Sequence, residues 1–110
     1  MLTLRLYMLQ RITALLMAPL VLGHLGVIIY AIQGGLSAAE ILDRTQGSVL
    51  WFLFYGLFVI AISAHGAIGL RVILYEWGGV KGRFLEPVMW VSGLGLFALG
   101  IRAIWAVTFA

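Results

Sequence analysis

The chain contains no cysteine, and only 10% of its 110 residues are charged. Without cysteine it has no disulfide and no iron–sulfur or thiolate metal site of its own. With 64% hydrophobic residues, the composition lies outside the range of soluble domains. The net charge of +3 is small, and nothing in the sequence supports nucleic-acid binding.

Charges are missing altogether from residues 12–39, 45–70 and 87–101. Each stretch approaches or exceeds the roughly 20 apolar residues that a helix needs to cross a hydrocarbon core. Because lipid offers no hydrogen bonds to an open backbone, the spans must be helical. The sequence therefore predicts an all-α integral membrane bundle of three transmembrane helices in one domain, residues 1–110. We place the spans near 12–32, 48–70 and 87–107, the last of which contains Arg102.

The first span also has the short basic flank of a signal peptide. Its apolar run is about twice the length of a usual signal h-region, however, and two further spans follow it. We therefore interpret it as a transmembrane helix. Between the first two spans, Ser37 is suited to cap a short helix over residues 38–43.

If the spans alternate in direction, basic residues gather on one side of the membrane. That side receives Arg5, Arg11, Arg71, Lys81 and Arg83, and the other receives Glu40, Asp43 and Arg44. The positive-inside rule then places the N-terminus in the cytoplasm or its topological equivalent. We expect the membrane to be a bacterial inner membrane. The four tryptophans, Trp51, Trp77, Trp90 and Trp105, fall near span ends, as interfacial aromatic residues do.

Both histidines of the chain lie inside predicted spans. From the rise of an α-helix, His24 lies about 20 Å above the level of Arg11, and His65 about 9 Å above Arg71. The two imidazoles therefore differ in depth by about 10 Å, and they do not bind one iron together. An ionisable residue inside a span is a functional hypothesis, and imidazole is a common haem ligand. The alternative is a hydrogen bond to a carbonyl or hydroxyl of a neighbouring helix.

The second span reads His65-Gly-Ala-Ile-Gly69-Leu-Arg71-Val-Ile-Leu-Tyr-Glu76-Trp77. It resembles the haem-ligating helix of the cytochrome b membrane-anchor subunits of succinate dehydrogenase and fumarate reductase. In that family the ligand His is followed by Gly four residues on, Arg at six and an acid at eleven. The segment Leu9-Gln10-Arg11-Ile12-Thr13-Ala14 likewise resembles the family's [HQ]-R-[IV]-[ST]-[GA] pattern. The resemblance covers most of the chain.

This resemblance implies roles for particular residues. His65 would be an axial ligand of a b-type haem, with Arg11 and Arg71 near the haem propionates and the quinone site. Tyr7 stands where the family commonly has Ser, and it would replace that residue as the hydrogen-bonding partner of the quinone. Glu76 would serve proton delivery, with a solvated loop acid as the alternative reading.

His24 and Arg102 extend the resemblance to a second haem. Anchors with two haems draw one ligand from the first helix, at a different depth from the ligand of the second helix. Arg102 lies about 22 Å above Pro87, close to the level of His24, and a propionate would pair it there. The alternative for Arg102 is that its side chain reaches back to the membrane surface.

We therefore expect an electron-transfer anchor subunit of a succinate:quinone or quinol:fumarate oxidoreductase. It would hold one haem b or two with a second anchor chain, and pass electrons between an iron–sulfur subunit and a membrane quinone. Nothing in this chain is suited to dicarboxylate chemistry, which would lie on a separate flavoprotein. The alternatives are a haem-free structural or proton-relay membrane subunit, and a small cytochrome b of another respiratory complex.

Overall fold

The computed structural model describes residues 3–109 as an all-helical protein. Its elements are α1 (Leu4–Gly34), α2 (Ala38–Thr45), α3 (Val49–Glu76) and α4 (Gly82–Thr108). Three of them, α1, α3 and α4, are long and apolar enough to cross a membrane, which confirms the predicted number of spans. The long axis of the molecule measures 48 Å, which is enough to pass through a bilayer with its headgroup regions.

The three long helices extend beyond the predicted spans. α1 begins eight residues before the charge-free stretch, and α4 begins at Gly82, so that Pro87 lies inside the helix instead of at its start. A charge-free stretch marks the hydrocarbon core, whereas helical hydrogen bonding continues through the charged interface on either side.

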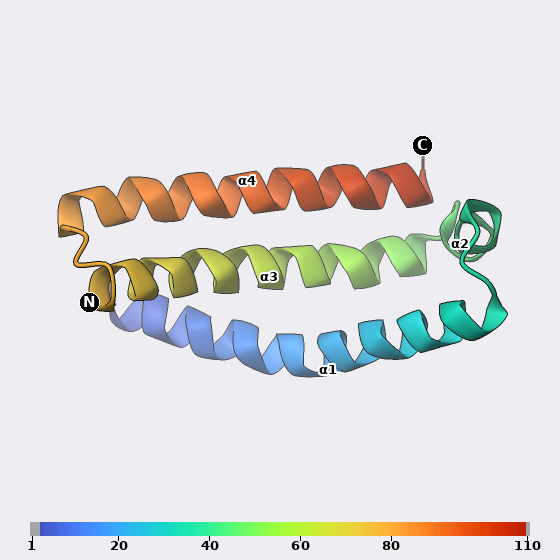
Figure 1. Cartoon of the computed structure of the whole chain (residues 1–110), viewed down its shortest axis with the longest axis horizontal. Helices are drawn as coiled ribbons and strands as arrows, with labels where there is room; N and C mark the ends of the chain where they lie inside the picture. Colours follow the sequence, from blue (N-terminus) through green and yellow to red (C-terminus); the bar gives the residue numbers. More distant parts are fainter. Residues whose placement is uncertain (1–2, 110) are drawn as a thin grey trace.

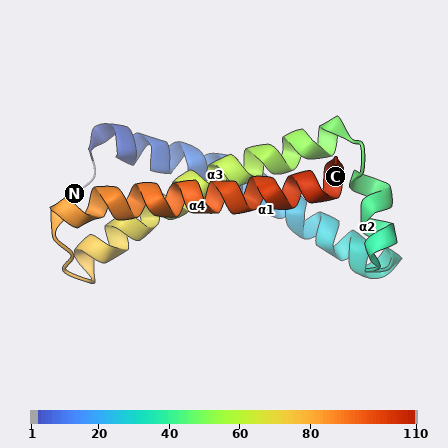
Figure 2. The same ribbon diagram turned by 90° about the horizontal axis from the view of Figure 1, so that it is seen from above.

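α3 lies between α1 and α4 (Figure 1). α1 crosses α3 obliquely (Figure 2), and it contains Pro19, which removes one backbone hydrogen bond and allows the helix to bend. α4 packs closely on α3 through small residues. Gly93 faces Ala67, and Gly100 faces Val59, as expected for helices that associate in lipid.

The short helix α2 closes one end of the bundle (Figure 1). Its cap is the predicted one, because the Ser37 side chain accepts a hydrogen bond from the Glu40 amide at 3.2 Å. Thr45, at its last turn, donates to the Val107 carbonyl at 2.7 Å. The opposite end carries the N-terminal end of α1, the end of α3 and the start of α4 (Figure 1). The five predicted basic residues belong to these segments and so lie at one end of the molecule.

Candidate functional site

His65 lies in the middle of α3 and faces α1. Its Nδ1 atom is 3.2 Å from the hydroxyl oxygen of Thr13, a buried residue that is 4% exposed. The same hydroxyl lies 2.9 Å from the Leu9 carbonyl and 3.0 Å from the Gln10 carbonyl of its own helix. The other ring nitrogen of His65, Nε2, has no hydrogen-bond partner among residues 3–109.

The imidazole of His65 borders an open groove of about 490 Å³ on the outer surface of α1 and α3. Every other side chain of the groove is apolar and comes from α1. These residues are Ala14, Met17, Ala18, Val21 and Leu22. A ligand bound here would meet one nitrogen in an otherwise apolar wall, the arrangement of a site for a flat hydrophobic group.

Gly69, one turn beyond His65 on α3, faces a side chain of α1. A Cβ atom at Gly69 would lie 3.5 Å from Nε2 of Gln10. The side chain of Gln10 on α1 therefore covers Gly69. A haem macrocycle would have to lie along the groove beside His65 and not against Gly69. The carbonyl oxygen of the Gln10 side chain is buried and has no hydrogen-bond partner among the described residues.

His24 packs against α3 at another level. Its ring lies edge-on to Tyr55 and Phe58, with centroid distances of 5.8 Å and 5.4 Å. Its Nδ1 atom is buried and has no hydrogen-bond partner in the described part of the chain. His65 lies level with Thr13, so the two histidines are separated by about 16 Å along α1. They lie too far apart to share an iron.

This separation exceeds the 10 Å expected from the sequence. That expectation set Arg11 and Arg71 at the same level, whereas the structure brings Arg71 level with Tyr7. The difference of four residues along α1 amounts to about 6 Å.

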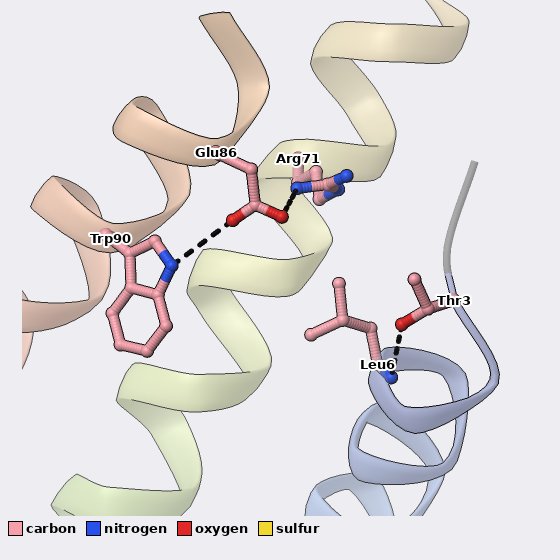
Figure 3. A network of polar contacts seen from close by, with 5 residues as sticks. All are labelled: Thr3, Leu6, Arg71, Glu86 and Trp90. Carbon is pink, nitrogen blue, oxygen red and sulfur yellow. Dashed lines mark hydrogen bonds and ion pairs between the residues drawn. The ribbon is translucent and has the colours of Figure 1, made fainter. Parts of the chain in front are cut away.

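Arg71 is held by the neighbouring helix (Figure 3). Its guanidinium forms an ion pair with Glu86 of α4 at 2.9 Å, and Glu86 also accepts a hydrogen bond from the Trp90 indole at 3.2 Å. The Arg71 side chain is 12% exposed, and its Nε atom has no hydrogen-bond partner among the described residues. Glu86 is not among the site residues that the sequence predicts. The signal was available, because an antiparallel pair of helices joined by a short loop brings the end of one beside the start of the next.

Beside Arg71, a pocket of about 360 Å³ opens between the start of α1 and the end of α3. It brings together three of the predicted site residues, namely Tyr7, Arg71 and Glu76, and adds Tyr75, which the sequence analysis did not select. Arg11 does not line this pocket. Its guanidinium carbon instead lies 5.8 Å from the centre of the Tyr7 ring.

Arg102 is exposed on α4 and has no ion-pair partner within residues 3–109. Its neighbour Gly100 packs on Val59, and His24 packs on Phe58, so Arg102 and His24 lie at similar levels. They lie on different helices, however, and α3 runs between those helices (Figure 1). The structure does not bring the two residues together.

Within residues 3–109, no three His, Cys, Asp or Glu side chains are grouped so that they could hold a metal ion. A haem iron has a smaller requirement, because the porphyrin supplies four nitrogens and a protein adds only axial ligands. His65 meets that requirement, because its imidazole borders an apolar groove and its Nε2 atom has no hydrogen-bond partner among the described residues.

Comparison with known proteins bears on these features. Neither a search of the curated proteins nor a search of the solved structures found a match. The family model described as the succinate dehydrogenase/fumarate reductase transmembrane subunit matches residues 1–109. This match covers nearly the whole chain and includes both segments on which the resemblance rests. The chain belongs to the succinate dehydrogenase/fumarate reductase transmembrane subunit family, and it is an integral membrane anchor that assembles with other subunits of such a complex.

Proposed function

We propose that this anchor subunit ligates a b-type haem through His65 and helps to form a quinone site. The observation that carries the proposal is the environment of His65. One ring nitrogen contacts Thr13, the other has no hydrogen-bond partner among the described residues, and the ring borders an apolar groove inside a candidate membrane span. When bound, haem supplies one-electron transfer, and this chain supplies a ligand and the surroundings of the cofactor.

The groove is open on one side, so it suits a haem whose second face is covered by another chain. A second anchor subunit would provide the other axial ligand, as in the family arrangement of two three-span chains. Arg11 lies two residues before Thr13 on α1 and is exposed at the same end of the bundle. We assign Arg11 to pairing with a haem propionate, because a guanidinium binds a carboxylate in a bidentate manner.

The quinone site belongs in the pocket beside Arg71. Tyr7 contributes a hydroxyl that donates to a quinone oxygen, and Glu76 contributes a carboxylate that exchanges protons with the aqueous side. Arg71 adds a positive charge, which Glu86 partly neutralises. This positive charge stabilises the negative charge that develops on a quinone oxygen during reduction. The α3 lining of the pocket begins at Arg71, six residues or about 9 Å beyond His65, so quinone and haem would be close neighbours.

We place this end of the bundle at the cytoplasmic face of a bacterial inner membrane, because its basic residues gather there. An iron–sulfur subunit would dock at this face and carry electrons between the quinone and a flavoprotein. The flavoprotein would hold the dicarboxylate chemistry of succinate or fumarate.

The proposal does not extend to a second haem at His24. A haem-ligating histidine normally donates its second ring N–H to an oxygen, which fixes the ring and strengthens the ligand. Nδ1 of His24 is instead buried without a hydrogen-bond partner among the described residues, and its ring lies edge-on to Tyr55 and Phe58. Arg102 lies on the other side of α3, and we infer that its exposed side chain extends to the membrane surface.

The test is the reduced-minus-oxidised absorbance spectrum of the complex purified with its partner subunits. We expect a b-type α-band in the native complex and its loss in His65→Leu. A native complex without the band would support the haem-free alternative. Co-purification without a flavoprotein and an iron–sulfur protein would support a cytochrome b of another respiratory complex.

A further inference from the structure

Thr13 touches His65, and its hydroxyl group has three neighbours for one proton. The neighbours are the Leu9 and Gln10 carbonyl oxygens, at 2.9 Å and 3.0 Å, and Nδ1 of His65, at 3.2 Å. Carbonyl oxygens only accept hydrogen bonds, whereas an imidazole nitrogen donates or accepts according to its tautomer. The direction in which the hydroxyl proton points is therefore coupled to the tautomer of the histidine.

Two arrangements satisfy the Thr13–His65 contact. In the first, Thr13 donates to a backbone carbonyl and accepts from Nδ1–H of His65, so that Nε2 carries a lone pair. In the second, Thr13 donates to Nδ1, and the proton of His65 lies on Nε2. Nε2 has no hydrogen-bond partner among the described residues, and the imidazole borders an apolar groove. The second arrangement leaves an N–H group unpaired there, which costs free energy.

The first arrangement leaves no donor unpaired at this contact. Thr13 is also 4% exposed, so water does not compete for its hydroxyl, and the bond to its own helix fixes the side-chain rotamer. We propose that Thr13 is a positioning residue that holds the proton of His65 on Nδ1 and turns the lone pair of Nε2 toward the haem iron. This inference rests on the proposed haem ligation by His65.

A hydrogen-bonded acceptor behind a ligating imidazole raises the basicity of the ligand, and its loss typically weakens metal binding by about 10–100-fold. In Thr13→Val the side chain keeps its shape and loses the hydroxyl. We expect the purified complex to lose haem affinity by about 10–100-fold. The haem that remains should have a more positive midpoint potential, because a weaker donor stabilises ferric iron less.

Thr13→Ser retains a hydroxyl group at this position, so its haem content and midpoint potential should stay close to the native values. Thr108→Val is the matched control. Thr108 is likewise a buried threonine, whose hydroxyl donates to the Ile104 carbonyl at 2.7 Å, but it lies at the far end of α4. We expect this control to leave the haem potential unchanged.

Native haem content and potential in Thr13→Val would overturn the role of Thr13, as would a loss in Thr13→Ser equal to that in Thr13→Val. If haem loss in Thr13→Val is no greater than in Thr108→Val, the residue has only a structural role. Failure of the underlying haem assignment has a different signature, namely a native complex without a b-type band or an unchanged band in His65→Leu.

Discussion

Gly100 of α4 faces Val59 of α3 without room for a side chain between them. A Cβ atom at Gly100 would lie 2.6 Å from Cγ1 and 2.8 Å from Cγ2 of Val59. These contacts hold α3 and α4 close together near the α2 end of the bundle. Since α3 also carries His65, the packing of α4 helps to fix the helix on which the proposed site is built.

Gly100→Ala should therefore destabilise the protein by about 1–3 kcal/mol, the usual cost of forcing a methyl group into a packed interface. Gly95→Ala is the control, because a Cβ atom at Gly95 meets nothing within 4 Å. Thermal unfolding of the purified complex measures both. Val59→Ala should restore part of the loss in the Gly100→Ala background, and equal stability of the two glycine variants would contradict this account.

The Arg71–Glu86 ion pair should contribute modestly to stability. Glu86 is 57% exposed, so we expect Glu86→Gln to cost about 1 kcal/mol, near the upper limit for a partly solvated pair. The unfolding midpoint of the complex should fall, and the loss should shrink at high salt if the pair is screened. Trp90→Phe removes the indole bond to Glu86 and leaves the ion pair in place, so it should have the smaller effect. A larger loss of stability in Trp90→Phe than in Glu86→Gln would show that the indole bond is the more important contact.

Sequence reasoning located the helices and several of their details from local signals. Long charge-free stretches predicted the three long helices, and Ser37 predicted the start of α2. The contacts between helices were harder to predict from the sequence, because they depend on how far one helix is displaced along its neighbour. The level of Arg71 illustrates this, since it lies beside Tyr7 and not beside Arg11.

In the candidate site, too, local features could be predicted from the sequence and contacts between helices could not. A local motif selected His65, whereas its contact with Thr13 joins residues that are far apart in the sequence. The neighbour of Gly69 is Gln10, which comes from another helix, and the ion-pair partner of Arg71 lies beyond a loop. Pairings of this kind follow from packing, and no periodicity within one helix reveals them.

Tyr7 should affect electron transfer to quinone without affecting the chemistry of the flavoprotein. Tyr7→Phe removes one hydroxyl from the pocket beside Arg71, and the loss of one hydrogen bond lowers quinone reduction by up to about tenfold. Electron transfer from succinate to a water-soluble dye should be unchanged. Tyr30→Phe is the matched control, because Tyr30 lies at the other end of α1. A similar decrease in both variants would argue against a quinone site at Tyr7.

His24→Phe should leave the haem content of the complex unchanged. Phenylalanine preserves the edge-on contacts with Tyr55 and Phe58, and it removes a buried nitrogen that has no partner among the described residues. Stability should therefore stay the same or rise slightly, because an unpaired buried polar group is costly. His65→Phe is the contrasting variant and should abolish the b-type band.

The haem content of each variant, measured per complex by the absorbance of its extracted haem, decides between one site and two. If His24→Phe halved the haem content, a second iron would have to be ligated at the level of Tyr55 and Phe58. His24 would then need an acceptor for its Nδ1 proton from outside residues 3–109, because none lies within them. The partner anchor chain is the natural source of such an acceptor. An unchanged haem content with an intact band would instead leave His65 as the sole haem ligand of this subunit.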